Sequence, residues 1–482
     1  MNKIFLIFLV AFFIILPAIA LSQAPDTAWV KTFNFGNDNE GWSVRETSDG
    51  GLILAGSGMP NGFGDWDILL IKTDANGNLD WTHNFGGLYS DEGRAVRQTP
   101  DGGFIFTGWT RTGATAGKSI MLIKTDASGQ MEWSRTYSDY DEQEIRSIEL
   151  TSDGGYIMAG WAKIPFSEDS TYEDALIMKT DSLGNEVWRK HYGGSNSQKA
   201  WSIINTFDGG FFVAGWSDIF PMGSENYILK LNQNGDSLWL RTFGYLYNDG
   251  ATSVLELPNH NIVVGGSLAD EYDENHAILA FPSQNGDTLN VGFWPQYRQI
   301  NSMSLTNDTC LIITGLDTSV NSSSFIAKVH LNGSTVWTKS FEDYPFAFSA
   351  RSIIQTSDGG YVFTGTTRSY PENIVLVKLA PEHAQNVKND NTILPQMVYL
   401  SKNYPNPFNS STLLKYRLSE KGPVTLSIYN LLGQKVATLV DGIQIAGEHQ
   451  ALWNSGSISS GVYFARLTVG GNSRSMKLIL MK

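Results

Sequence analysis

Aromatic and basic side chains recur at one position of the chain, and they are the residues best suited to hold a ligand. Read from copy to copy, this position holds Trp42, Arg94, Arg146, Trp201, Thr252, Asn301 and Arg351. An indole ring packs against the flat face of a sugar, and a guanidinium donates paired hydrogen bonds to carboxylate or sulfate groups. We therefore predict a glycan-binding site at the tryptophans and arginines of this set.

Three further tryptophans, Trp109, Trp161 and Trp216, follow a recurrent glycine in consecutive copies. If the strand that carries them ends on the same face, they would extend the site. The alternative is structural: the tryptophans wedge between repeated units, and the arginines pair with acidic residues nearby, because repeated residues usually serve the repeat. The acids considered for such pairs are Asp91, Glu92, Asp141 and Glu142.

All these positions belong to a repeat. An Asp-Gly-Gly turn or a close variant of it recurs, and a glycine follows it seven residues later each time. The turn begins at Asp49, Asp101, Asp153, Asp208, Asn259, Asp308 and Asp358. Intervals of 49 to 55 residues fit four short strands and their turns, as in a propeller blade. The sequence therefore predicts an all-β fold with a seven-bladed β-propeller over residues 25–380.

A recurrent Asn-Gly pair predicts a two-residue hairpin turn, since both residues tolerate positive φ. Counting outward from the turn places Lys72 opposite Trp81, and the other copies give equivalent pairs. In the fifth copy Phe281 and Asn290 replace both residues, which indicates that the two side chains are in contact. We expect the lysine stem to lie on the indole face.

The two ends of the repeat region complement each other. Residues 28–33 form a tryptophan strand that no lysine strand precedes, and residues 373–379 form a lysine strand that no tryptophan strand follows. We predict that the N-terminal strand completes the seventh blade, with Trp29 opposite Lys378. The ring would then close without an open sheet edge.

Residues 1–20 have the pattern of a secretory signal peptide, with an apolar core from Ile4 to Leu16 and small residues after it. That core is short for a membrane span. We therefore expect an exported mature chain without a transmembrane segment. Cys310 is the single cysteine, so no disulfide can form within the chain, and stability must come from burial.

Residues 381–397 lose the period and the aromatic residues, and they are predicted to be a linker. Residues 398–482 carry nine Lys and Arg against three Asp and Glu, whereas the whole chain has a net charge of −14. Alternating apolar residues in this last part predict a small Ig-like antiparallel β-sandwich.

This C-terminal stretch resembles the type A C-terminal sorting domain of proteins exported by the type IX secretion system of Bacteroidota. The resemblance is carried by the motif at residues 403–409, the segments 428–434 and 461–463, and the end at 477–482. It implies an outer-membrane secretion translocon as partner, and a protein that is secreted or attached to the outer-membrane surface. An ordinary Ig-like adhesive module is the alternative.

Several function classes find little support. An acidic body argues against nucleic acid as a partner. The seven histidines lack the spacing of metal ligands, and no nucleophile triad or phosphate loop occurs. Oxygens at residues 74–78 could bind Ca²⁺, but the equivalent segment 232–235 has no carboxylate, which favours plain turn chemistry. No cofactor is therefore predicted.

The chain is thus predicted to be a non-enzymatic binding protein whose ligand is an extracellular glycan or protein. The alternative is a propeller-based glycan-active enzyme of the sialidase or lyase kind. An acidic pair with a raised pKa at the channel mouth would favour that enzyme.

Overall fold

A computed structural model describes residues 22–59, 65–113, 116–167, 170–193, 196–218, 223–244, 249–269, 275–282, 289–294, 296–318, 323–341, 348–368, 370–382, 399–400, 408–418, 422–430, 434–445, 447–456, 458–469 and 472–481. The predicted signal peptide, nearly all of the predicted linker and the motif at 403–407 lie outside these ranges. Within them the protein is entirely β-structure, and the boundary between two compact units falls after His383. The predicted fold class is confirmed.

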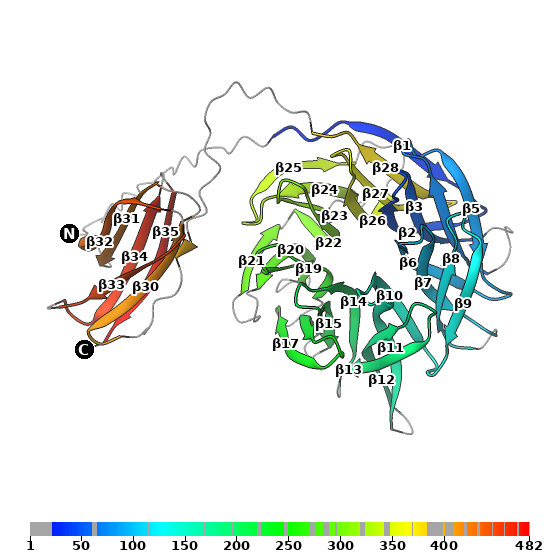
Figure 1. The fold of residues 1–482 in the computed structure, drawn as a ribbon, viewed down its shortest axis with the longest axis horizontal. Coiled ribbons are helices and arrows are strands. Elements are labelled where there is room, and N and C mark those ends of the chain that lie inside the picture. Colours follow the sequence, from blue (N-terminus) through cyan, green and yellow to red (C-terminus); the bar gives the residue numbers. More distant parts are fainter. Residues whose placement is uncertain are drawn as a thin grey trace, which may run out of the picture. The chain divides into compact units, whose positions relative to one another are not determined.

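The first unit contains seven four-stranded antiparallel sheets in the described part of the chain, arranged as blades around a common axis (Figure 1). Blades 1 to 3 are β2 (Asn39–Glu46), β3 (Leu52–Gly58), β4 (Asp67–Thr73) and β5 (Leu79–Phe85); β6 (Asp91–Gln98), β7 (Phe104–Thr110), β8 (Ser119–Thr125) and β9 (Met131–Tyr137); and β10 (Gln143–Leu150), β11 (Tyr156–Ser167), β12 (Ser170–Thr180) and β13 (Glu186–Tyr192).

Blades 4 to 6 continue in the same order, from the innermost strand to the outermost. They are β14 (Gln198–Asn205), β15 (Phe211–Asp218), β16 (Ser224–Leu231) and β17 (Ser237–Phe243); β18 (Gly250–Glu256), β19 (Ile262–Ala269), β20 (Asn275–Pro282) and β21 (Leu289–Trp294); and β22 (Tyr297–Leu305), β23 (Leu311–Asp317), β24 (Ser324–Val329) and β25 (Thr335–Ser340).

The seventh blade joins the two ends of the unit. It consists of β26 (Phe348–Gln355), β27 (Tyr361–Thr367), β28 (Ile374–Leu379) and, as its outermost strand, β1 (Thr27–Phe33). β1 pairs antiparallel with β28, and the register places Trp29 opposite Lys378. The strand that begins the chain therefore covers the edge of the strand that ends the repeats.

The hairpin turns differ from the sequence prediction in one respect. The loop between β4 and β5 is longer than two residues, because the Gly77 N–H donates to the Asp74 carbonyl and the Asp74 N–H donates to the Asn78 carbonyl. Counting residues outward from the turn nevertheless predicts the correct partner, because a register shift at the start of β5 restores the pairing of Lys72 with Trp81. Gly77 has a φ of 73°, which explains why glycine occupies this turn.

The lysine of each pair has a different partner from the one expected. Among the described residues, no cation–π contact joins these lysines to the tryptophans opposite them. Lys124, which is 4% exposed, instead places its ammonium 2.8 Å from Asp101, the first residue of the Asp-Gly-Gly turn. The other pairs of this kind are Lys72–Asp49, Lys179–Asp153, Lys230–Asp208, Lys328–Asp308 and Lys378–Asp358. The lysine therefore fastens the turn to the third strand of its own blade.

Hydrogen bonds strengthen this attachment. A threonine two residues before each aspartate also binds its carboxylate, as Thr99 binds Asp101. Burial acts to raise the pKa of Asp101, but the bonds from Lys124 and Thr99 outweigh it and lower that pKa to about 2. The pKa values of Asp49, Asp153 and Asp208 are likewise lowered to about 2.

The tryptophans of the outermost strands pack between blades. Trp81 of blade 1 lies 5.9 Å, centroid to centroid, from Phe104 of blade 2, and Trp337 of blade 6 lies 5.7 Å from Tyr361 of blade 7. The hairpin turn between the third and fourth strands of the next blade lies against the same rings. A Cβ at Gly129 would come within 2.7 Å of Trp81, so the turn glycine also permits close approach between blades.

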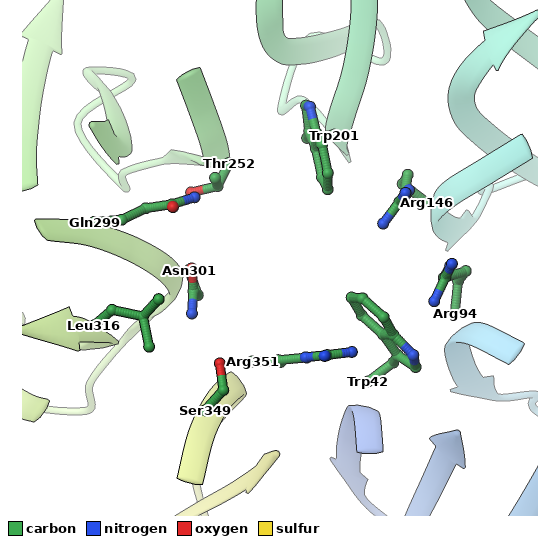
Figure 2. Close-up of a pocket in the computed structure, with 10 residues that line it drawn as sticks. All are labelled: Trp42, Arg94, Arg146, Trp201, Thr252, Gln299, Asn301, Leu316, Ser349 and Arg351. Atoms are coloured by element: carbon green, nitrogen blue, oxygen red, sulfur yellow. The ribbon is translucent and has the colours of Figure 1, made fainter. Parts of the chain in front are cut away.

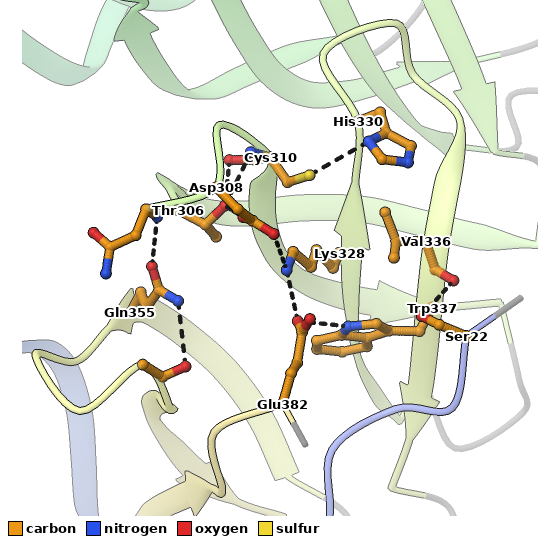
Figure 3. A network of polar contacts seen from close by, with 12 residues as sticks. Ser22, Thr306, Asp308, Cys310, Lys328, His330, Val336, Trp337, Gln355 and Glu382 are labelled. Atoms are coloured by element: carbon orange, nitrogen blue, oxygen red, sulfur yellow. Dashed lines mark hydrogen bonds and ion pairs between the residues drawn. The ribbon is translucent and has the colours of Figure 1, made fainter. Parts of the chain in front are cut away.

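The end of the first unit is tied to blade 6 (Figure 3). Glu382, which follows β28, accepts hydrogen bonds from Lys328, from the Trp337 indole and from the Tyr361 hydroxyl. At the other end of the unit, the Ser22 N–H donates to the Val336 carbonyl. Both terminal segments of the propeller are therefore fixed to neighbouring parts of blades 6 and 7.

The second unit is a two-sheet sandwich. One sheet contains β29 (Tyr399–Leu400), β30 (Ser411–Leu418) and β33 (Gly447–Asn454), and the other contains β31 (Gly422–Asn430), β32 (Lys435–Gln444), β34 (Gly461–Val469) and β35 (Asn472–Leu480). Trp453, Tyr416 and Phe408 are buried in the core between the two sheets. The predicted small β-sandwich is confirmed.

Closure of the ring by β1 predicts a specific loss of stability. Phe33 is buried at the end of β1, against the core of blades 1 and 7. Phe33→Ala should lower the free energy of unfolding by about 3–5 kcal/mol, measured by urea unfolding with tryptophan fluorescence. Thr32→Ala, at an exposed position of the same strand, is the control and should change little. Equal behaviour of the two variants would contradict a closing role for β1.

The lysine–aspartate pairs predict an acid-sensitive fold. The folded pKa of Asp101 is about 2 against an ordinary 3.8, so its contribution is complete above pH 4 and is lost as the pH falls toward 2. Asp101→Asn should therefore lower the melting temperature at pH 7 and flatten its decline between pH 4 and 2.

Blade 5 supplies the control for that experiment, because it has Asn259 at the aspartate position and Phe281 at the lysine position. Asn259→Asp adds a carboxylate without a lysine partner and should not stabilise the protein at neutral pH. An acid profile of Asp101→Asn that matches the wild type would refute the assignment.

Candidate functional site at the channel mouth

Each innermost strand contains a β-bulge at the position singled out in the sequence. The pairing register skips one residue there, for example between Gly41 and Ser43 in β2. The seven skipped residues are Trp42, Arg94, Arg146, Trp201, Thr252, Asn301 and Arg351. A bulged residue leaves the ladder and its side chain is re-aimed, so seven equivalent bulges direct seven side chains toward one place.

The residue after the bulge holds neighbouring blades together. The Ser352 hydroxyl accepts a hydrogen bond from the Val44 N–H of the next inner strand, at 3.3 Å, and Ser147 accepts one from Ile203. Ser202 and Ser302 make the same bond to the blade that follows them. A small hydroxyl side chain at this position therefore fixes the spacing of the inner strands around the axis.

The bulged side chains line a cavity of about 290 Å³, and all seven innermost strands contribute to it (Figure 2). Its lining is Trp42, Arg94, Arg146, Trp201, Thr252, Gln299, Asn301, Leu316, Ser349 and Arg351. The cavity lies at the end of the inner strands where the chain arrives from the preceding blade. The five aromatic and basic residues of the predicted site are thus brought together.

Arginine planes are stacked on the indole rings of this cavity. The guanidinium carbon of Arg351 lies 3.5 Å from the ring centroid of Trp42, and that of Arg94 lies 4.0 Å from the same centroid. Arg146 lies 4.4 Å from the Trp201 centroid. Cation–π contact of this kind holds a guanidinium in a defined plane. The tryptophans therefore orient the arginines, in addition to lining the cavity.

Three glutamates that sequence reasoning did not single out as site residues lie beside the arginines. Glu40 accepts two hydrogen bonds from Arg351, at 3.2 and 3.3 Å. Glu92 lies 2.6 Å from Arg94, and Glu144, with a side chain only 1% exposed, lies 2.8 Å from Arg94. All three glutamates stand two residues before a bulge, in consecutive copies. This regular spacing could have identified them in the sequence.

Glu144 is the most heavily engaged of the three. Its carboxylate lies 2.7 Å from Arg146 and 3.5 Å from Lys118, in addition to its contact with Arg94. Burial acts to raise the pKa of Glu144, but the three cations outweigh burial and lower it. Glu144 is therefore a fixed negative charge beside the arginines of the cavity.

The second predicted set of tryptophans does not line the cavity. Trp109 and Trp161 are only 4% and 8% exposed, so the expectation that they would be exposed on this face is wrong. Lys118 and Lys199 cover their rings, each at 4.1 Å from the centroid. Trp216 is half-buried, and Lys199 lies 5.7 Å from it. These residues pack the blades, as the structural alternative held.

The structural alternative named the wrong acids for most of the arginine pairs. Of the four acids considered, only Glu92 pairs with an arginine of the cavity, and Glu142 lies 3.9 Å from Arg111 outside it. Asp91 is fully buried and accepts a hydrogen bond from the Gly87 N–H. The glutamates that pair with the cavity arginines lie on the inner strands themselves, each two residues before the bulged residue.

Carboxyl groups with raised pKa values lie away from the cavity lining. Burial raises the pKa values of Asp67, Asp91, Asp174 and Asp218. Burial, together with Glu40 and Asp38, raises that of Glu372. None of these groups is among the residues that line the cavity. The marker that would favour an enzyme is therefore not found in the lining.

Metal ligation finds little support in the described part of the chain. No group of three or more His, Cys, Asp or Glu side chains is placed there to hold an ion. The carboxylate of Asp74 is used by its own turn, since Oδ1 accepts from the N–H groups of Asn76 and Asn78. Among the described residues, none belongs to a helix able to cross a membrane.

Comparison with known proteins identifies the C-terminal unit. Residues 402–481 match the family described as secretion system C-terminal sorting domain. The chain therefore carries a type IX sorting domain, and the protein is secreted or held at the cell surface. The resemblance seen in the sequence is confirmed.

The chain is also similar to proteins of varied kinds. The regulatory protein FlaEY of Caulobacter vibrioides is 23% identical over 210 residues, which cover 39% of this chain and 22% of that protein. A protein of unknown function from Dyadobacter fermentans (TM-score 0.44) and the β-propeller domain of the trilobed protease from Pyrococcus furiosus (0.43) are each 10% identical. They cover 74% and 76% of this chain, and 99% of their own length in both cases.

Proposed function

We propose that the protein is a non-enzymatic binding protein that holds an extracellular carbohydrate at the mouth of its propeller channel. The observation that carries the proposal is the convergence of seven bulged side chains on one cavity lined by tryptophan and arginine. Export by the sorting domain brings this cavity into contact with material outside the cell. Aromatic and planar cationic groups in a concave site suit a sugar with polar substituents.

The acid chemistry of the cavity supports binding rather than bond cleavage. A general acid needs a carboxyl whose pKa is raised toward the working pH. Glu144, which contacts both Arg94 and Arg146, has a lowered pKa, and Glu40 is bonded to Arg351 and to the Trp42 indole. These carboxylates act on the arginines, which favours a role in holding the site together.

A carbohydrate array probed with the full chain tests the proposal. Trp201→Ala should abolish binding while leaving the melting temperature close to that of the wild type, because Trp201 lines the cavity and is partly exposed. Trp109→Ala is the contrasting variant. It removes a buried side chain and should cost about 3–5 kcal/mol of stability.

Three results would count against the proposal. Absence of binding to every carbohydrate on the array would reject the ligand class. Release of new reducing ends from a bound carbohydrate would instead support the alternative of a glycan-active enzyme. Loss of stability in Trp201→Ala equal to that in Trp109→Ala would show that Trp201 is a packing residue.

A further inference from the structure

Arg146 has hydrogen-bonding capacity that the protein does not use. Its Nε lies 2.7 Å from Glu144, yet the alignment is too poor for a hydrogen bond. Among the described residues, none accepts a hydrogen bond from its two terminal nitrogens. A guanidinium carries five N–H donors, so the donors of the two terminal nitrogens are left for a ligand or water. The free donors face the cavity, where Figure 2 shows Arg146 between Trp201 and Trp42.

From this feature we infer that the ligand is anchored by an oxyanion, the carboxylate or sulfate of a terminal acidic sugar, held by Arg146. The inference rests on the proposed function and specifies its ligand. Two donors on one planar group match two oxygens of a carboxylate or a sulfate. A neutral hydroxyl would use these donors less completely.

The charge around Arg146 supports an anion. One carboxylate, Glu144, is shared by Arg94, Arg146 and Lys118. Glu92 and Glu40 lie instead against Arg94 and Arg351. Arg146 is therefore the cavity arginine that has no carboxylate to itself. Burial, with Arg94 nearby, lowers its pKa to about 10, so the side chain remains charged at neutral pH and still lacks a full counter-charge.

The stacking in the cavity supports the same reading. Arg94 and Arg351 both lie over Trp42, so the protein itself already covers that indole. A sugar therefore meets N–H edges of arginines on this side of the cavity more than a bare aromatic face. Preorganised guanidinium planes lose little freedom on binding, which favours recognition of planar or tetrahedral oxyanions.

The other side of the cavity is polar and neutral, and it suits hydroxyl groups. Gln299 and Asn301 lie there beside Thr252. Asn301 donates to the Ala350 carbonyl and Thr252 donates to the Ile300 carbonyl, which leaves acceptor oxygens for a ligand. A ligand that fills the cavity should carry an acid group toward Arg146 and hydroxyl groups toward the neutral side. An acidic sugar has both, whereas the carboxyl end of a peptide has only the acid group.

The shape of the cavity restricts which part of a chain can enter. All seven inner strands surround it, so a ligand must approach along the channel axis. Its volume of about 290 Å³ is at the lower limit of small-molecule sites. A polymer can therefore insert an end or a side group, whereas an internal stretch would need an open groove.

The test measures affinities of the full chain for four probes by calorimetry. Three are matched oligosaccharides that end in a glucuronate, in a sulfated glucose or in plain glucose, and the fourth is a peptide with a free carboxyl end. At least one acidic sugar should bind roughly 10- to 100-fold more tightly than the neutral sugar, as charge-assisted hydrogen bonds imply. The two acidic probes distinguish carboxylate from sulfate.

Variants of the protein then test whether Arg146 causes the preference for acidic sugars. Arg146→Gln should remove the advantage of the acidic sugar, and Arg146→Lys should keep only part of it because the paired donors are lost. Arg241→Gln, on the outermost strand β17, is the control and should behave as the wild type.

Equal binding of acidic and neutral sugars would overturn the oxyanion and leave carbohydrate binding intact. Tighter binding of the peptide would overturn the ligand class. If no sugar binds, the proposed function fails as well.

Discussion

Crowding around one axis is the constraint on which this structure depends. Seven inner strands must lie side by side around a narrow channel, and a serine in most copies bridges each strand to the next, as Ser352 does to Val44. The bulge immediately before that serine removes one residue from the pairing ladder. The same local device therefore spaces the blades and directs a side chain, such as that of Arg351, into the channel mouth.

The two ends of the propeller have different tasks. At the turn end, buried lysines hold the Asp-Gly-Gly turns to their own blades, as Lys124 holds Asp101. At the channel mouth, the bulged position varies from tryptophan to arginine to asparagine. Variation at one end and repetition at the other fit a scaffold whose stability is built into the repeat and whose channel mouth can change by single substitutions.

Much of this architecture could be predicted from the sequence, because period and turn chemistry report directly on strands. The fold class, the blade number and the pairing of Lys72 with Trp81 came from spacing alone. Side-chain partners were harder to predict. Lys72 forms an ion pair with Asp49, because a buried ammonium is stabilised more by a carboxylate than by an indole ring. The burial of Trp109 could not be predicted, because the position of a residue on a strand does not reveal that Lys118 covers its ring.

A blocking measurement tests most directly whether the channel mouth is the binding site. The single native cysteine, Cys310, is buried and its pKa is raised to about 11, first by burial, so an introduced thiol can be labelled selectively at pH 7. Ser349→Cys places a thiol in the cavity, and Ser48→Cys places one on an exposed turn at the opposite end. With a bulky maleimide attached, the first variant should lose carbohydrate binding and the second should keep it. Undiminished binding by labelled Ser349→Cys would contradict the account.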